Sequence, residues 1–421
     1  MAVLAVAVLV EFAARGPYRA LSGDSQDLTV HYAAARVWLR GGNPYDMQQI
    51  AQAFLDGGGP VARVPKAATM PSVYPPVTHA VAAPMALLGW RGATIAMQVI
   101  SLTLVVSALL ALAHAMRLRG WQTMWLFVGG LALAPLHTGM AEGQVTIPSA
   151  ALLILGWALL SERPALSGVL FAIGAALKPH LAVPFALVGV ARPRPRWLLA
   201  GSAVFLGLLA VGELRLVAAG HDPIHDWLRN VALAAAPGAL NSATPENPAS
   251  LTLINLDLLL LRVLHDPALA RFLGLALLLP IAALAVWRLK TASTAEDDPY
   301  AVSLLCVVSL LAMYHRVYDA VLLWIALAAV VRDWERLPRL LRAIAAVAFA
   351  AFLVPGPIAL DVLARSGYLP GRLVESGLWQ VLVLPHQVWL LSALALGLVP
   401  MLVEAVRQAR SLPERPPALE D

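Results

Sequence analysis

Apolar runs separated by short polar segments make up most of the chain. A helix needs about 20 apolar residues to cross the ~30 Å interior of a bilayer, and roughly 17 is the minimum. Twelve runs reach or approach this length, at about residues 1–14, 93–116, 121–137, 144–160, 165–177, 180–191, 197–219, 269–288, 300–314, 318–331, 343–360 and 381–404. The pattern predicts an all-α polytopic membrane protein with about twelve transmembrane helices, within a range of roughly ten to thirteen.

Two longer segments, residues 15–92 and 220–268, lack such runs, and we expect them to be loops. The first contains an amphipathic stretch between Leu28 and Trp38. We expect a single membrane domain over residues 1–409 and a disordered, proline-rich cytoplasmic tail over residues 410–421. The first apolar run has neither a basic start nor a small-residue cleavage site. It therefore predicts a short membrane helix, whose start could lie a few residues upstream, rather than a cleaved signal.

Composition agrees with a chain covered by lipid. Of 421 residues, 60% are hydrophobic and 13% are charged, whereas a soluble globular chain has about 25% charged residues. The net charge of +5 comes from basic residues that stand in short clusters between apolar runs, which argues against nucleic-acid binding. The only cysteine, Cys306, excludes a disulfide within the chain.

Basic residues in short loops indicate the cytoplasmic side of a membrane protein. If the N-terminus is cytoplasmic, the cytoplasmic connections contain Arg117, Arg119, Arg163, Arg192, Arg194, Arg196, Arg288, Lys290, Arg332, Arg336, Arg339, Arg342, Arg407 and Arg410. The opposite short connections contain only Lys178 and Arg316. We therefore predict that both termini are cytoplasmic and that the two long loops are extracytoplasmic.

Five groups of polar residues fall on this extracytoplasmic side. They are Asp24, Asp27, His31, Asn43, Tyr45 and Asp46; Tyr74 and His79; His137, Glu142, Gly143 and Gln144; Lys178 and His180; and Tyr314, His315, Arg316, Tyr318 and Asp319. Ionisable residues at membrane depth are costly and usually functional. We expect the five groups to form one site.

The residue types favour a phosphorylated substrate. Lysine and arginine hold phosphate through charge-assisted hydrogen bonds, and a carboxylate, Asp27 first among them, can take a proton from an attacking hydroxyl. The chain contains neither a G-x-x-x-x-G-K-[ST] motif nor a G-x-G-x-x-G motif. A lipid-phosphate donor that enters from the bilayer therefore fits better than a nucleotide.

At these residues the chain resembles glycosyltransferase family 87. Asp27-Leu28-Thr29-Val30-His31-Tyr32-Ala33-Ala34-Ala35, followed by Gly41-Gly42-Asn43-Pro44-Tyr45-Asp46, is similar to the first periplasmic loop of that family. Tyr74-Pro75-Pro76 with Pro84, Gly143-Gln144, Gly168 through Lys178-Pro179, and His315 with Tyr318-Asp319 resemble further family segments in the same order. Each motif is short, but the ordered set, over about residues 20–330, is fairly specific.

The resemblance implies a GT-C fold and an inverting transfer of mannose from polyprenyl phosphate. It implies Asp27 as the catalytic base and His315 as a second catalytic residue. The expected donor-phosphate ligands are Lys178, Arg316 and His180, and the expected substrate-binding residues are Asp24, Tyr45, Tyr74, Gln144, Tyr318 and Asp319. No metal or other cofactor is expected, although Asp24 with Asp27 could hold a divalent ion.

The implied partners are a polyprenyl-phosphate-sugar donor, a lipid or glycan acceptor and membrane lipid, at a bacterial inner membrane with the site facing the periplasm. Arabinose or glucose stays open as the sugar, and the acceptor and oligomeric state are not indicated. A transporter or flippase is the main alternative, but it would place charges near the midplane, often in two similar halves. A non-catalytic assembly subunit would not need Asp, Lys and His on one face.

Each candidate residue also has a structural interpretation. Asp27 could cap the helix that begins near Leu28, and Lys178 could extend from a helix end toward the membrane interface. His315 and Arg316 could pair with Asp319. Gln144 could join two helices, and Tyr74-Pro75-Pro76 is typical of a rigid turn.

Overall fold

The computed structural model describes residues 2–244, 246–247, 249–291 and 298–411, without the side chains of Asp24 and residues 403–411. In the first half the helices are α1 (Ala2–Ala13), η1 (Ala14–Tyr18), η2 (Ala20–Asp24), α2 (Gln26–Leu39), α3 (Met47–Asp56), η3 (Val61–Arg63), α4 (Val64–Thr69), α5 (Pro76–Ala86), α6 (Trp90–Ala115), α7 (Trp121–Ala132), α8 (Ala134–Glu142), α9 (Thr146–Ala158), α10 (Pro164–Leu177), α11 (Pro179–Ala191) and α12 (Pro195–Ala218). In the second half they are α13 (Pro223–Ala235), η4 (Ser250–Thr252), α14 (Leu256–Leu264), α15 (Pro267–Thr291), α16 (Pro299–Ala312), η5 (Val317–Leu322), α17 (Leu323–Asp333), α18 (Arg339–Ala351), α19 (Gly356–Arg365), α20 (Gly371–Val374), η6 (Trp379–Val383) and α21 (His386–Ser411).

Every predicted apolar run overlaps at least one of these helices, and the all-α class is confirmed. By length and composition, three described helices can cross a membrane, namely α6, α12 and α15. The number rises to five if each bent pair, α7–α8 at 50° and α18–α19 at 56°, is one span. Helices α9, α10, α11 and α16 are apolar but have only 13 or 14 residues, about 20 Å at 1.5 Å per residue. The count of about twelve spans and the GT-C fold therefore stay predictions.

Helices α12 and α15 expose most of their apolar surface. Only 11% and 22% of their most apolar windows are buried in the protein, and Leu199 and Phe272 are 72% and 67% exposed. Apolar patches of this size on a monomer need a covering, and both helices are long enough for a bilayer to supply it. Inside the bundle, by contrast, α16 is buried nearly all round, as expected for a helix that is apolar on every face.

The N-terminal helix is longer than its apolar run. Two π-helical segments, η1 and η2, continue α1 as far as Asp24. Pro17, which has no amide hydrogen to donate, lies in the first of these wider segments. Helical backbone therefore continues past Arg15, the predicted start of the loop, as far as Ser22, and Gly23, with φ of 127°, turns the chain toward α2. The extracytoplasmic location of this segment stays a prediction.

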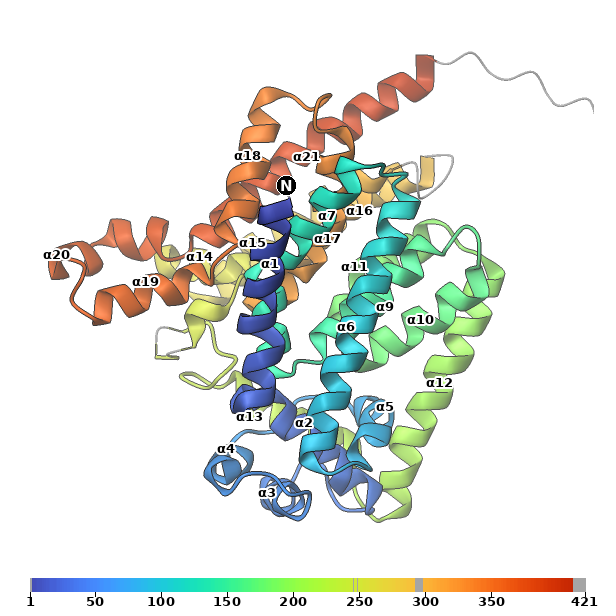
Figure 1. Cartoon of the computed structure of the whole chain (residues 1–421), viewed down its shortest axis with the longest axis vertical. Helices are drawn as coiled ribbons and strands as arrows, with labels where there is room; N and C mark the ends of the chain where they lie inside the picture. Colours follow the sequence, from blue (N-terminus) through green and yellow to red (C-terminus); the bar gives the residue numbers. More distant parts are fainter. Residues whose placement is uncertain (1, 245, 248, 292–297, 412–421) are drawn as a thin grey trace, which may run out of the picture.

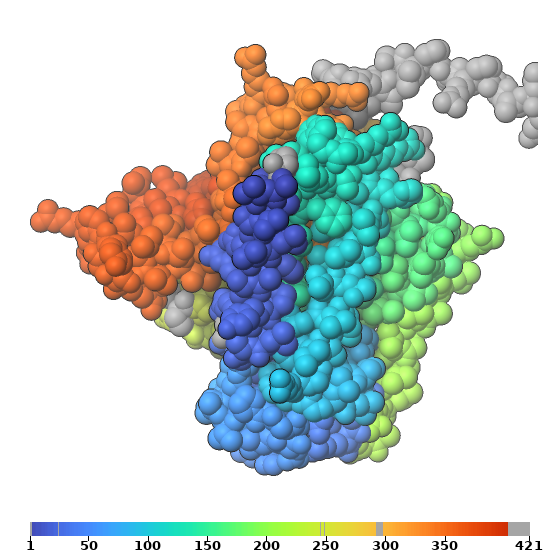
Figure 2. All heavy atoms as spheres, in the orientation of Figure 1, coloured from blue at the N-terminus to red at the C-terminus, as the bar shows by residue number. Residues whose placement is uncertain are grey.

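Helices α2, α3, α4, α5 and α13 gather at one end of the molecule, and the N-terminus and the end of α21 lie at the other (Figure 1). The segment 15–92 is thus mainly helical rather than an open loop. The stretch between Leu28 and Trp38 is helical, and residues 28–35 are all buried in α2, so this part of the helix presents no polar face to solvent. Near the C-terminus, α19 and α20 project from the body (Figure 2). Helix α21 includes Arg410 and Ser411, where the disordered tail was predicted to begin, and the rest of the predicted tail, residues 412–421, lies outside the described part.

Gly168 allows α10 and α12 to pack closely. A Cβ atom at this position would lie 2.4 Å from the carbonyl oxygen of Trp197 and 2.9 Å from the amide nitrogen of Gly201. Because backbone atoms cannot move aside singly, Gly168→Ala is expected to destabilise the protein by about 1–3 kcal/mol and to lower its melting temperature in detergent.

The matched control is Gly207→Ala on α12, where a Cβ atom meets open space. Alanine is favoured over glycine inside helices by about 1 kcal/mol, so this variant should melt no lower than the wild type. Equal melting temperatures for the two variants would show that the α10–α12 contact does not depend on Gly168.

Candidate active site

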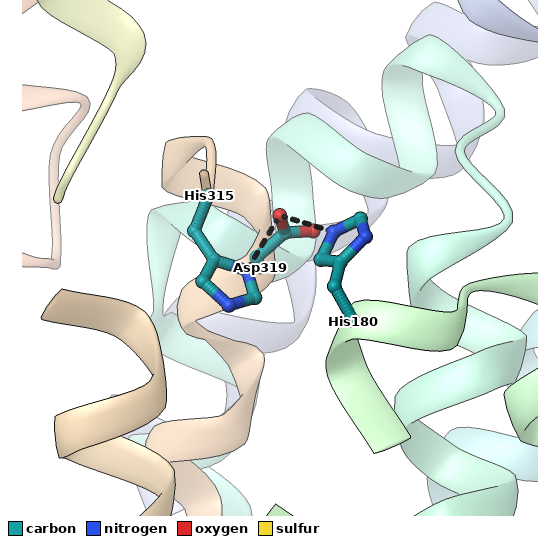
Figure 3. A group of neighbouring side chains, drawn as sticks. All are labelled: His180, His315 and Asp319. Carbon is teal, nitrogen blue, oxygen red and sulfur yellow. Dashed lines mark hydrogen bonds and ion pairs between the residues drawn. The ribbon is translucent and has the colours of Figure 1, made fainter. Parts of the chain in front are cut away.

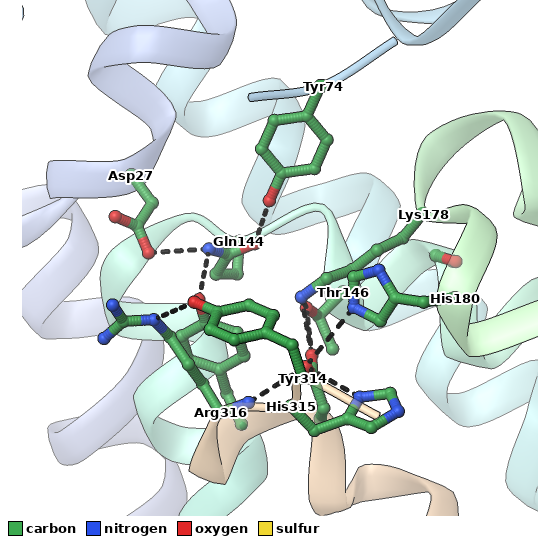
Figure 4. Close-up of polar contacts among 12 residues, drawn as sticks. Asp27, Tyr74, Gln144, Thr146, Lys178, His180, Tyr314, His315 and Arg316 are labelled. Atoms are coloured by element: carbon green, nitrogen blue, oxygen red, sulfur yellow. Dashed lines mark hydrogen bonds and ion pairs between the residues drawn. The ribbon is translucent and has the colours of Figure 1, made fainter. Parts of the chain in front are cut away.

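Five polar segments that are distant in the sequence meet beside α2, near the ends of α8, α10 and α16 (Figure 4). The contacts described below join Asp27, Tyr74, Gln144, Lys178, His180, His315, Arg316, Tyr318 and Asp319, so the predicted gathering of the polar groups occurs for these nine residues. They form two parts, an outer ring around Asp27 and a buried cluster around Asp319.

A break between α7 and α8 directs one segment toward this site. Pro135 cannot donate a hydrogen bond to the carbonyl of Leu131, four residues earlier, and the side chain of His137 contacts that oxygen instead, at 2.6 Å. At the other end of α8, Gly143 has a left-handed conformation with φ of 65°. A Cβ atom there would lie 2.7 Å from Cβ of Leu28. Glycine therefore permits both the turn and the close approach of α2.

The outer ring is centred on the carboxylate of Asp27. Its Oδ2 accepts a hydrogen bond from Nε2 of Gln144 at 2.7 Å, and the same nitrogen lies 2.9 Å from the hydroxyl of Tyr318. The hydroxyl of Tyr74 donates to Oε1 of Gln144 at 3.4 Å. Asp27 stands in the first turn of α2, after the N-cap Ser25, so it is not the helix cap. Its side chain is partly exposed and available to a ligand.

The inner cluster is centred on Asp319, which is fully buried. Its Oδ1 accepts from Nζ of Lys178 at 2.6 Å and from the hydroxyl of Thr146 at 2.8 Å. Its Oδ2 lies 3.1 Å from Nδ1 of His315 and 3.7 Å from Nε2 of His180. Lys178 is only 3% exposed, so it does not extend toward the membrane interface. The structural pairing of His315 with Asp319 is present.

Arg316 provides a positive charge without a direct counterion. Its side chain donates to the hydroxyls of Tyr314 at 2.7 Å and Thr252 at 2.8 Å and to the carbonyl of Leu240 at 2.7 Å. These acceptors are neutral, and no carboxylate among the described residues forms an ion pair with its side chain, although Asp27 is near enough for the two charges to interact. A partly buried guanidinium of this kind favours an anionic ligand.

Lys66 on α4 is a second cation, and it is absent from the predicted site residues. Its Nζ lies 2.5 Å from Oε1 of Gln26. Burial lowers the pKa of Lys66, and the nearby charges of Asp27 and Glu142 partly oppose this effect. The sequence contains one usable signal, because this arginine-rich chain has only three lysines, Lys66, Lys178 and Lys290. Two of the three lie at the site.

Two other residues, Tyr45 and His31, support Tyr74 rather than line the site. Tyr45 is buried, and its hydroxyl donates to the carbonyl of Tyr74 at 3.0 Å, so it positions Tyr74 rather than lining the site. The ring of His31 contacts the ring of Tyr74, with centroids 4.2 Å apart, and burial lowers the pKa of His31 to about 3, which keeps it neutral. The side chain of Asp24 lies outside the described part of the structure.

Comparison with known proteins identifies the family. The family model of glycosyltransferase family 87 matches residues 73–314, more than half of the chain. The match includes Tyr74, Gln144 and Lys178, begins after Asp27 and ends just before His315. No curated protein and no solved structure matches the chain. Together with the exposed apolar helices, the match shows a membrane glycosyltransferase, and the chain belongs to glycosyltransferase family 87.

Proposed function

We propose that this enzyme transfers a sugar from a polyprenyl-phosphate donor to a hydroxyl group of a lipid or glycan acceptor. The observation that supports this most strongly is the placement of Asp27. It is a partly exposed carboxylate, held by Gln144, and it lies within electrostatic range of Arg316 and Lys66. A base beside cations suits attack by a hydroxyl and departure of a phosphate.

The proposed reaction is an inverting displacement at the anomeric carbon. The acceptor oxygen forms a bond to that carbon while the bond from carbon to the phosphate oxygen breaks. The electron pair leaves with the polyprenyl phosphate, and the hydroxyl proton moves to the carboxylate of Asp27. A phosphate monoester is a fair leaving group, so this displacement does not require a metal ion.

We assign the departing phosphate to Arg316 and Lys66, which stabilise the developing negative charge. Lys178 was the first expected phosphate ligand, but its ammonium group is already paired with Asp319 at 2.6 Å. His315 is likewise fully buried against Asp319. We therefore propose that Lys178 and His315 act as positioning residues, which fix Arg316 through the turn that contains Asp319.

The family membership favours an enzyme over a transporter, a flippase or an assembly subunit. We further propose that the enzyme lies in a bacterial inner membrane with the site on the extracytoplasmic face. The charges around the site lie at helix ends, as expected for a site reached from one face. Mannose is the proposed sugar, by resemblance to the family.

Asp27→Asn is expected to lower transfer from a polyprenyl-phosphate-sugar donor by about 10²–10⁴-fold, the contribution of a general base. Asparagine still offers an oxygen to Nε2 of Gln144, so the fold should persist, and the melting temperature checks this. Asp56→Asn removes a carboxylate of the same external part that pairs with Arg40, and it should transfer normally. Normal turnover by the Asp27→Asn variant would show that Asp27 is not the catalytic base.

Lys66→Met is expected to lower kcat/KM for the donor by roughly 10- to 100-fold, because a hydrogen bond to a charged group contributes about 1.5–3 kcal/mol. The effect should shrink at high salt, which screens exposed charges. Lys290→Met, at the end of α15, is the matched control with no expected effect. If both variants behave alike, Lys66 has no role at the phosphate.

A panel of polyprenyl-phosphate donors that differ only in the sugar tests the proposed specificity. Mannosyl transfer should exceed glucosyl and arabinosyl transfer in kcat/KM, and the product should have the inverted anomeric configuration. A preference for the arabinosyl donor would show that mannose is not the preferred sugar. Retention of the anomeric configuration would exclude a single displacement with Asp27 as the base.

A further inference from the structure

Three potential metal ligands lie close together in the inner cluster (Figure 3). Nε2 of His180, Nδ1 of His315 and a carboxylate oxygen of Asp319 all lie within 4.8 Å of one another. The two distances to Oδ2 of Asp319 are 3.1 Å from His315 and 3.7 Å from His180. Ligand atoms at about 2.0–2.1 Å from a tetrahedral ion are about 3.3 Å apart. The two distances to Asp319 differ from this value by only a few tenths of an ångström, so small side-chain movements would bring both histidines to the required spacing from the carboxylate.

The imidazole of His180 provides independent support. Its Nε2 is enclosed, and within the described part of the chain it has no hydrogen-bond partner. The 3.7 Å separation from Asp319 is too long for a hydrogen bond. A buried polar atom without a partner is rare in native proteins and calls for a specific reason. An ion between the three groups would provide one.

The surroundings resemble the outer shell of a metal site. Oδ1 of Asp319 accepts from Lys178 and Thr146, and Oδ2, the oxygen that faces both histidines, accepts from the backbone amide of Arg316 at 3.2 Å. A bound ion would take the place of the Asp319–His315 contact at Oδ2 and keep the amide as its outer partner. The second ring nitrogen of His315 lies 3.5 Å from the hydroxyl of Ser309. Metal-binding histidines and carboxylates usually have such partners, which fix their orientation.

We propose that His180, His315 and Asp319 bind one divalent transition-metal ion of the Zn²⁺ type. Two imidazoles and one carboxylate suit Zn²⁺, whereas Mg²⁺ and Ca²⁺ prefer oxygen ligands. Three protein ligands leave a fourth position for water or an anionic oxygen. The metal site does not rest on the proposed function, in which Arg316 and Lys66 hold the departing phosphate.

The test uses the full-length protein in detergent, freed of metal by a chelator and then loaded with Zn²⁺. After removal of excess ion, elemental analysis should find one zinc per chain in the wild type. His180→Ala and His315→Ala should lose stoichiometric zinc, and His180 is the safer site for substitution because its side chain is 30% exposed. Co²⁺ as a spectroscopic probe should give the intense visible bands of a tetrahedral site in the wild type but not in His180→Ala or His315→Ala.

Two controls separate this inference from the proposed reaction. His114→Ala removes a histidine that is 78% exposed and distant from the cluster, and it should keep the zinc. Asp27→Asn should also keep the zinc while it loses transfer. Absence of stoichiometric metal from the wild type, or equal metal in the wild type and a folded His180→Ala variant, would show that the cluster is a hydrogen-bonded network only.

Discussion

The carboxylate of Asp319 is the buried charge on which the arrangement of the site depends. Transfer of a carboxylate out of water costs several kcal/mol unless the group is paired and hydrogen-bonded. Here the partners come from separate segments: Thr146 begins α9, Lys178 joins α10 to α11, and His315 precedes η5. Loss of one partner would leave an uncompensated charge, at a cost of about 3–5 kcal/mol. The ends of four helical segments are therefore fixed relative to one another by one side chain.

The shortness of the central helices follows from the same constraint. Helices α9, α10 and α11 begin or end at this cluster, and each break leaves backbone groups that need partners. Some of these partners are visible, since the amide of Ile254 donates to the carbonyl of His315 at 3.1 Å. Irregular backbone at membrane depth is tolerated only where protein or a polar cavity surrounds it. Broken helices and a buried ionic cluster are thus two aspects of one structure.

The sequence predicted those features that depend on local pattern. Apolar runs located the helices, because hydropathy and length are local properties, and the gathering of Asp27, Gln144, Lys178 and His315 followed from their positions between runs. The pairings were not predictable, because nothing in a single sequence indicates that Lys178 pairs with Asp319 rather than with a phosphate. The burial of α2 was missed for a similar reason: its small residues at 33–35 look like a surface face until α5 covers them.

The two parts of the site have different physical requirements, and Arg316 connects them. Its backbone amide donates to Oδ2 of Asp319 at 3.2 Å, while its guanidinium extends toward the outer ring. A base has to be exposed to reach a substrate, as Asp27 is, and it needs a neutral holder such as Gln144 that does not neutralise it. A rigid ionic cluster, by contrast, gains from complete burial, because its interactions are then not screened by water. Separation of the exposed base from the buried cluster satisfies both requirements, and the backbone of Arg316 transmits the rigidity of the cluster to the cation that faces the substrate.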